Sequence, residues 1–194
     1  MGMTDALTQK LTDIIRADPG LMHVLTTVRA LGLPDWRLVS GAVYQAVWNV
    51  QTGRPAGYGV KDYDLAYFDG ADLSYAAEDI VIKQVAAAFD EPFRSRVEVR
   101  NQARVHLWFQ DRFGEPYPPL ASTDEALGRF VAPTFAVGVR LETDDRLTVA
   151  APFGLKDVFS MTIRPNPNRP VASSWPKVIE NARARWPELT VVEP

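Results

Sequence analysis

The sequence contains no cysteine among its 194 residues. Disulfide-stabilised folds, thiol nucleophiles and cysteine-ligated zinc are therefore excluded. Histidine is almost as scarce, because His23 and His106 are the two present. They lie far apart in the chain, so a multi-histidine metal site is excluded too.

Long apolar runs are also missing. No stretch approaches the about 20 apolar residues that cross a bilayer, and residues 1–10 lack the pattern of a cleaved signal peptide. We therefore expect a cytoplasmic protein with no membrane partner.

The chain has little excess charge. Its net charge is −3, and its sequence pI is about 5.4. Broad binding to nucleic acid needs a basic surface, so we do not expect it here. A small polyanion such as a nucleotide is still allowed, since a metal ion and a few local cations are enough to bind it.

Composition and length fit one folded unit. Hydrophobic residues make up 46% of the chain and charged residues 23%, which is typical of a globular domain. We predict a single domain over 1–194, with an N-terminal helical hairpin (1–34), a core (36–113) and a C-terminal elaboration (114–194).

Hydrophobic periodicity and turn residues predict a mixture of helices and strands. The predicted helices cover 4–17, 21–31, a segment that begins directly after Gly41, 74–89, 103–113, 123–130, 154–161 and 174–186. The predicted strands cover 36–39, 62–68, 96–101, 134–142, 146–150 and, at an edge, 189–192. This pattern favours an α+β fold with a small mixed sheet flanked by helices.

Two acids share one face of the strand predicted at 62–68. Side chains two residues apart in a strand point the same way, so Asp62 and Asp64 lie about 6–7 Å apart at Cα and can converge on one hard cation. The alternative is a solvated acidic face. A second pair at this spacing, Glu142 and Asp144, falls in a predicted turn, so the spacing alone is weak evidence.

The neighbouring segments strengthen the metal-site hypothesis. Ser40-Gly41-Ala42 separates a strand from a helix, where backbone N–H groups are free to bind phosphate. Glu98 lies between two core-facing valines of a later strand and therefore faces away from the core. Placed beside Asp62 and Asp64, it completes a cluster that can hold divalent ions, and it can act as a general base.

Together these segments resemble the nucleotidyltransferase superfamily that includes the palm of DNA polymerase beta. More narrowly, the chain resembles a bacterial family of small uncharacterised predicted nucleotidyltransferases. The matching segments begin at Gly41, Asp62, Val97 and Ala151, and they span about residues 38–165.

The resemblance implies a nucleoside triphosphate substrate, an acceptor hydroxyl and Mg²⁺ or Mn²⁺. By this resemblance, Asp62 and Asp64 correspond to the metal-binding pair and Glu98 to the third carboxylate. Gly41 corresponds to the glycine that approaches phosphate.

Two departures from the superfamily pattern stand out. The residue after the glycine is Ala42, where the superfamily usually has serine or a second glycine, so a hydroxyl contact is lost unless Ser40 replaces it. The loop at 51–59 also lengthens the distance to the acidic pair. Both departures are compatible with a relative that binds nucleotide without transferring it.

Asn101, Arg104 and His106, which follow Glu98 in the sequence, complete the predicted nucleotide site. Arg104 offers charge to a triphosphate, and Asn101 and His106 offer hydrogen bonds. The structural alternatives are Arg104 paired to an acid and His106 held between its hydrophobic neighbours.

The sequence therefore leaves three functions open. The first is nucleotidyl transfer with Asp62, Asp64 and Glu98 as catalytic groups. The second is a non-catalytic nucleotide-binding or regulatory module, and the third is a phosphoester hydrolase that uses the same carboxylates with water as the nucleophile.

Overall fold

The computed structural model describes residues 3–194, with side chains from residue 5 onward. It begins with two helices, α1 (Met3–Ala17) and α2 (Pro19–Leu31), which pack together as the predicted hairpin. Asp18 starts α2 by accepting hydrogen bonds from the first-turn amides, and Gly32 ends it in the left-handed conformation at φ 66°.

The central sheet has five strands in the order β3-β2-β1-β4-β5. Their bounds are β1 (Arg37–Val39), β2 (Tyr63–Tyr67), β3 (Val97–Asn101), β4 (Gly138–Leu141) and β5 (Leu147–Ala150). Strands β2 and β3 run parallel, whereas the other neighbouring pairs are antiparallel. The predicted α+β fold with a small mixed sheet is confirmed.

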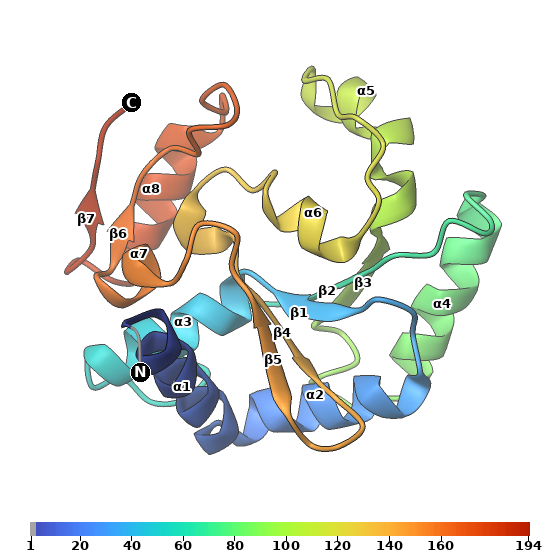
Figure 1. The fold of residues 1–194 in the computed structure, drawn as a ribbon, viewed down its shortest axis with the longest axis horizontal. Helices are drawn as coiled ribbons and strands as arrows, with labels where there is room; N and C mark the ends of the chain where they lie inside the picture. The colour runs from blue at the N-terminus through green and yellow to red at the C-terminus, as the bar shows by residue number, and fades with distance from the viewer. Residues whose placement is uncertain (1–2) are drawn as a thin grey trace.

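The inner face of the sheet carries the main core. Alternation along β2 buries Tyr63, Leu65 and Tyr67, which pack with the apolar faces of α1, α2, α3 (Gly41–Gln51) and α4 (Tyr75–Ala87). Figure 1 shows α2 beneath the strands and α4 beside β3. Residues of opposite parity along β2 therefore point to the outer face.

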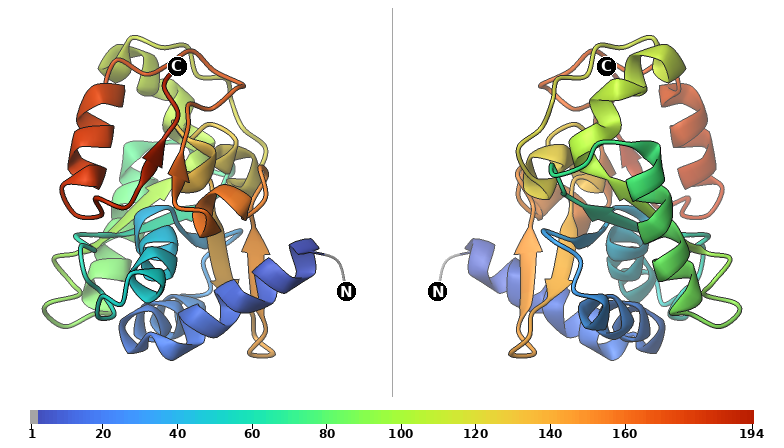
Figure 2. Two further views of the ribbon diagram at one scale, coloured as in Figure 1. Left: turned by 90° about the vertical axis from the view of Figure 1, so that its left-hand side faces the viewer. Right: turned by 90° about the vertical axis from the view of Figure 1, so that its right-hand side faces the viewer.

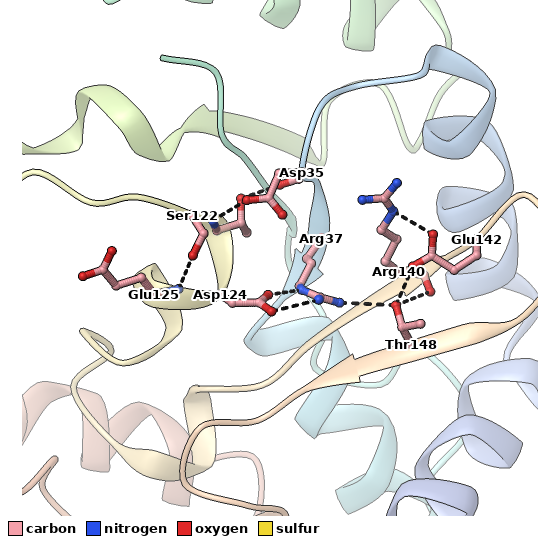
Figure 3. A network of polar contacts seen from close by, with 9 residues as sticks. Asp35, Arg37, Ser122, Asp124, Glu125, Arg140, Glu142 and Thr148 are labelled. Atoms are coloured by element: carbon pink, nitrogen blue, oxygen red, sulfur yellow. Dashed lines mark hydrogen bonds and ion pairs between the residues drawn. The ribbon is translucent and has the colours of Figure 1, made fainter.

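Helix α6 (Thr123–Leu127) covers part of the outer face. Its Leu127 packs on Val39 and Ala66 in a small second core. Polar contacts fix the helix in place: Arg37 of β1 pairs with Asp124, and the Thr123 amide donates to Asp35 at 2.7 Å (Figure 3). The outer face thus divides into a part under α6 and an open part at the start of β2 and β3.

The same network continues from β1 to the β4–β5 hairpin. Arg37 also donates to Thr148, whose hydroxyl donates to Glu142 at 2.8 Å, and Arg140 pairs with the same glutamate (Figure 3). Glu142, one member of the second acidic pair, is therefore committed to the β4–β5 hairpin. Its neighbour Asp144 pairs with Arg146 in the turn.

The C-terminal region forms a small unit that docks on α3. It contains η2 (Pro133–Phe135), α7 (Lys156–Phe159), β6 (Thr162–Ile163), α8 (Trp175–Arg183) and β7 (Thr190–Val191). Strands β6 and β7 pair with each other, so the strand predicted at 189–192 exists but does not extend the central sheet. None of the helices in residues 3–194 has the length and apolarity needed to cross a membrane.

Trp186 is the anchor of this docking. Its ring is fully buried against Trp48 of α3, with centroids 5.3 Å apart, and its Nε1 donates to Asn49 at 3.1 Å. Figure 2 shows α8 on the side of the sheet that α3 occupies. The C-terminal segment therefore packs against the last turns of α3.

The helix predicted at 103–113 is broken into two pieces. A 3₁₀ helix, η1 (Gln102–Leu107), follows β3 directly, and α5 (Phe109–Phe113) begins after Trp108. The Asn101 side chain caps η1, and Trp108 leaves helical geometry at φ −132°. The rings of Trp108, Phe109 and Phe113, at and after this break, contact one another.

Candidate functional site

Asp64 and Glu98 lie side by side on the open outer face. They are register partners in the parallel pair β2–β3, and on its other side Asp64 pairs with Val39 of β1. Partners in register point to the same face of a sheet. Asp62 precedes β2 by one residue, and all three acids are exposed to solvent.

The three carboxylates interact electrostatically. Loss of hydration, followed by the charges of Glu98 and then Asp62, raises the pKa of Asp64 to about 6, while the charge of Arg100 opposes the rise. A carboxylate held this close to two others favours a proton or a bound cation. Arg100 also lies 3.9 Å from Glu98, as a weak ion pair.

The donor chemistry fits a hard divalent cation. Carboxylate oxygens are the ligands that Mg²⁺ and Mn²⁺ prefer, and a cation would relieve the repulsion between the acids. Within residues 3–194, however, no three histidine, cysteine, aspartate or glutamate side chains are already grouped as a metal centre. A bound ion therefore belongs to the proposal below.

Ser40 makes the turn between β1 and α3 in a strained conformation. Its dihedrals are φ 57° and ψ −120°, a region that favours glycine. Its backbone is held at both ends, since its amide donates to Val137 at 2.8 Å and its carbonyl accepts from Val43 and Tyr44. Its hydroxyl does not cap α3. Backbone strain of this kind is common at binding sites.

The first turn of α3 follows this serine. The amides of Gly41 and Ala42 have no acceptor within the helix, because α3 begins there. The Ala42 side chain is buried at 1% exposure, so it presents only its backbone to a ligand. The start of α3 follows Val39, which is the register partner of Asp64. A free helix N-terminus and an acidic group therefore share one end of the sheet.

Comparison with protein families identifies the chain. A family described as Nucleotidyltransferase matches residues 26–191. The chain belongs to this nucleotidyltransferase family. No curated protein matches it.

Solved structures agree with the family. A structure described as a CCA-adding enzyme head domain is 25% identical, covers 96% of both chains and has a TM-score of 0.78. A complex of a CCA-adding enzyme with CTP is 14% identical with a TM-score of 0.54, over 96% of this chain and 43% of that one. A tRNA-processing enzyme complex is 18% identical with a TM-score of 0.50, over 88% and 43%.

The last two likenesses show the fold alone, and this nucleotidyltransferase spans less than half the length of those proteins. The predicted family, fold and enzyme class are confirmed.

Two further residues, Tyr44 and Arg185, were missed from the sequence. Burial raises the pKa of Tyr44, with a hydrogen bond from Gln45 and the charge of Arg185 opposing the shift and the charge of Asp64 adding to it. The Tyr44 phenol therefore lies within electrostatic reach of both Asp64 and Arg185. Tyr44 stands one helical turn after Gly41, which is a local signal. No local pattern marks Arg185, because tertiary docking of Trp186 brings it there.

The predicted phosphate cation Arg104 is engaged elsewhere in this nucleotidyltransferase. It pairs with Glu78 of α4, whose side chain is 3% exposed, and donates to the Leu73 carbonyl at 3.2 Å. Glu78 also accepts the Asn101 amide at 2.8 Å. The structure thus gives Arg104 the acid partner that the sequence left as an alternative.

Asn101 and His106 also lie outside the acidic group. Asn101 is buried, and its amide joins β3 to the backbone of Asp69. His106 lies in η1 with a buried Nδ1 that has no hydrogen-bond partner among the described residues. The structure brings Ser40, Gly41, Ala42, Asp64 and Glu98 to one end of the sheet, and it does not bring Asn101, Arg104 or His106 there.

Proposed function

We propose that this nucleotidyltransferase moves a nucleoside monophosphate from a nucleoside triphosphate to an acceptor hydroxyl. In this proposal, Asp62 and Asp64 hold Mg²⁺ or Mn²⁺, and Glu98 accepts the hydroxyl proton. The observation that carries the proposal is the register pairing of Asp64 with Glu98 on the open outer face. Such a reaction draws on the nucleotide pool of the cytoplasm, which fits the expected location.

The donor triphosphate is assigned to the start of α3. Free amides at Gly41 and Ala42 suit phosphate oxygens, and the Ser40 hydroxyl, which does not cap the helix, can add a donor. Arg185, whose charge acts on the Tyr44 phenol, offers a nearby cation. The shared fold of a CCA-adding enzyme solved with CTP supports a triphosphate donor.

Balanced chemistry follows from this arrangement. The acceptor oxygen attacks the α-phosphorus, the bond from that phosphorus to the bridging oxygen breaks, and pyrophosphate leaves with the bond electrons. The hydroxyl proton passes to the Glu98 carboxylate. A divalent cation, when bound, neutralises phosphate charge and favours ionisation of the attacking hydroxyl.

Calorimetry with a non-hydrolysable triphosphate and Mn²⁺ tests the donor site. Asp62→Asn and Asp64→Asn should each lose Mn²⁺-dependent binding. Asp144→Asn is the matched control, because Asp144 belongs to an acidic pair of the same spacing that is committed to a turn. Equal binding by all three variants would remove the metal assignment.

A product assay separates transfer from hydrolysis and from binding alone. With α-labelled triphosphate and pooled small alcohols as acceptors, we expect pyrophosphate release together with a labelled, nucleotidylated product. Free nucleoside monophosphate as the sole labelled product would indicate water as the nucleophile. Binding with no turnover would indicate a non-catalytic module.

A further inference from the structure

A cavity of about 370 Å³ lies at the far end of β3, where Arg100 forms part of its wall. Its walls come from α5, α6 and the segment that leads into α8, and Figure 1 shows α5 and that segment on opposite sides above α6. The volume lies within the range of small-molecule sites. Nothing in the donor site described above uses this cavity.

The cavity is connected to the proposed base. Arg100 lines it and also lies 3.9 Å from the Glu98 carboxylate. Both residues project from the outer face of β3, two positions apart, which is about 7 Å. A ligand in the cavity therefore extends toward Glu98 and away from the start of α3.

One wall is a cluster of aromatic rings. The Phe109 ring lies 4.7 Å from that of Phe113 and 4.5 Å from that of Tyr117, centroid to centroid, and Trp108 adjoins them at 6.1 Å. The break between η1 and α5 turns these rings together. Aromatic faces of this kind favour a flat, apolar ring as ligand.

The charges in the wall favour an anion. Three arginines and one glutamate line the cavity, in a chain whose net charge is −3. The glutamate, Glu115, forms an ion pair with Arg169. Arg129 is half-buried as a residue, and its guanidinium has neither a hydrogen bond nor an ion pair with any residue whose side chain the structure describes. A partly desolvated arginine with no acid beside it attracts a carboxylate or phosphate.

We infer that this cavity seats the acceptor of the transfer, a small hydroxylated molecule with an aromatic ring and one anionic group. The ring lies on the Phe109–Phe113–Tyr117 wall, the anion on Arg129, and the hydroxyl points past Arg100 to Glu98. That the ligand is the acceptor rests on the proposed function, whereas its chemical class is argued from the cavity alone.

Burial raises the pKa of Tyr117 to about 12, with Arg129 and Arg169 opposing the rise. The phenol therefore remains a neutral hydrogen-bond donor at physiological pH, and it lies near the two arginines. A neutral donor beside a cation adds to recognition of an anionic oxygen.

Ligand-observed NMR with three matched probes tests the ligand class. The probes are para-(hydroxymethyl)benzoate, its neutral benzamide, and the cyclohexane analogue of the benzoate. We expect the benzoate to bind with a dissociation constant of about 1 mM or tighter. The benzamide and the cyclohexane analogue should each bind about tenfold more weakly. Equal binding of all three, or no binding of the benzoate, would overturn the inference.

Variants locate the binding. Arg129→Gln should weaken the benzoate about tenfold and leave the benzamide unchanged. Arg183→Gln is the control, because Arg183 is exposed on α8 and does not line the cavity. An Arg129→Gln protein that binds the benzoate like the wild type would refute the assignment of the anion to Arg129.

Competition separates acceptor from donor. The benzoate should stay bound when a non-hydrolysable triphosphate and Mn²⁺ saturate the protein. Displacement by the triphosphate would show that the cavity holds part of the nucleotide, and it would overturn the inference while leaving the proposed transfer intact. Failure of triphosphate binding, with benzoate binding retained, would instead count against the proposed function.

Discussion

Asp64 of β2 and Glu98 of β3 are register partners in a parallel strand pair, and loss of hydration together with the charge of Glu98 raises the pKa of Asp64. Two carboxylates on adjacent strands repel each other at neutral pH, and Asp62 adds to that repulsion. The protein therefore keeps a locally unfavourable arrangement, as expected for residues that serve a ligand rather than the fold.

Removing the charge of Asp64 should stabilise the ligand-free protein. The pKa of Asp64 is about 6 in the folded protein and 3.8 for an ordinary aspartate, so the native state holds the proton more tightly. Stability is therefore lost as pH rises from about 4 to about 6 in the wild type. Because Asp64 is exposed, solvent screening should limit the gain of Asp64→Asn at pH 7 to below about 1 kcal/mol.

Thermal unfolding at a series of pH values measures this effect. The difference in melting temperature between Asp64→Asn and the wild type should be near zero below pH 4, grow to about pH 6, and then stay constant. Millimolar MgCl₂ should raise the melting temperature of the wild type and leave that of the variant unchanged. A difference independent of pH would contradict the electrostatic cause.

The Arg104–Glu78 pair makes a separate prediction about stability. Arg104→Gln leaves the buried Glu78 without its cation, so the free energy of unfolding should fall by about 3–5 kcal/mol. Lys83→Gln, which breaks an exposed ion pair with Asp79 on the same helix, should leave the free energy of unfolding almost unchanged. Urea denaturation measures both.

Nucleotide affinity decides whether Arg104 has a second role. If Arg104 is structural, the folded fraction of Arg104→Gln should bind the triphosphate analogue with wild-type affinity. A loss of affinity without loss of stability would restore the prediction that Arg104 neutralises the triphosphate.

Two glycines of the loop before β2 form a matched pair. A Cβ atom at Gly59, where φ is 72°, would lie 2.5 Å from Cη2 of Trp186. Gly57 has a similar φ of 74° and nothing within 4 Å. Both alanine variants suffer the backbone strain, but only Gly59→Ala must also displace the Trp186 ring. We expect it to be about 1–3 kcal/mol less stable than Gly57→Ala.

Tryptophan fluorescence and thermal unfolding report the displacement. Gly59→Ala should also weaken triphosphate binding, because Arg185 donates to the Gly59 carbonyl at 2.6 Å and moves with Trp186. Equal stability of the two variants would show that the C-terminal unit is not anchored at Trp186.

Ser40 separates backbone strain from hydroxyl chemistry. Ser40→Gly relieves the left-handed strain and should stabilise the protein by about 0.5–1 kcal/mol, whereas Ser40→Ala should not. Both variants lose the hydroxyl, so the affinity of each for the triphosphate analogue should fall by about tenfold or more. Unfolding and calorimetry give the two readouts. Wild-type affinity in both variants would exclude the hydroxyl as a phosphate ligand.

The sequence by itself determined the features that depend on local periodicity. Alternation along residues 62–68 placed Asp62 and Asp64 on one face, and the same rule turned Glu98 outward between buried neighbours. The glycine-containing turn and the helix that follows it were also visible, because turn formation and helix starts depend on a few adjacent residues. The single-domain organisation stays a prediction.

Tertiary structure decided what depends on contacts between distant segments. Only strand register put Glu98 beside Asp64, only the docking of Trp186 brought Arg185 near Tyr44, and only α4 packing gave Arg104 its partner in Glu78. The break at Trp108, which builds the aromatic wall of the cavity, was likewise invisible. Such contacts join residues tens of positions apart, and their free energies come from burial and pairing that no local pattern encodes.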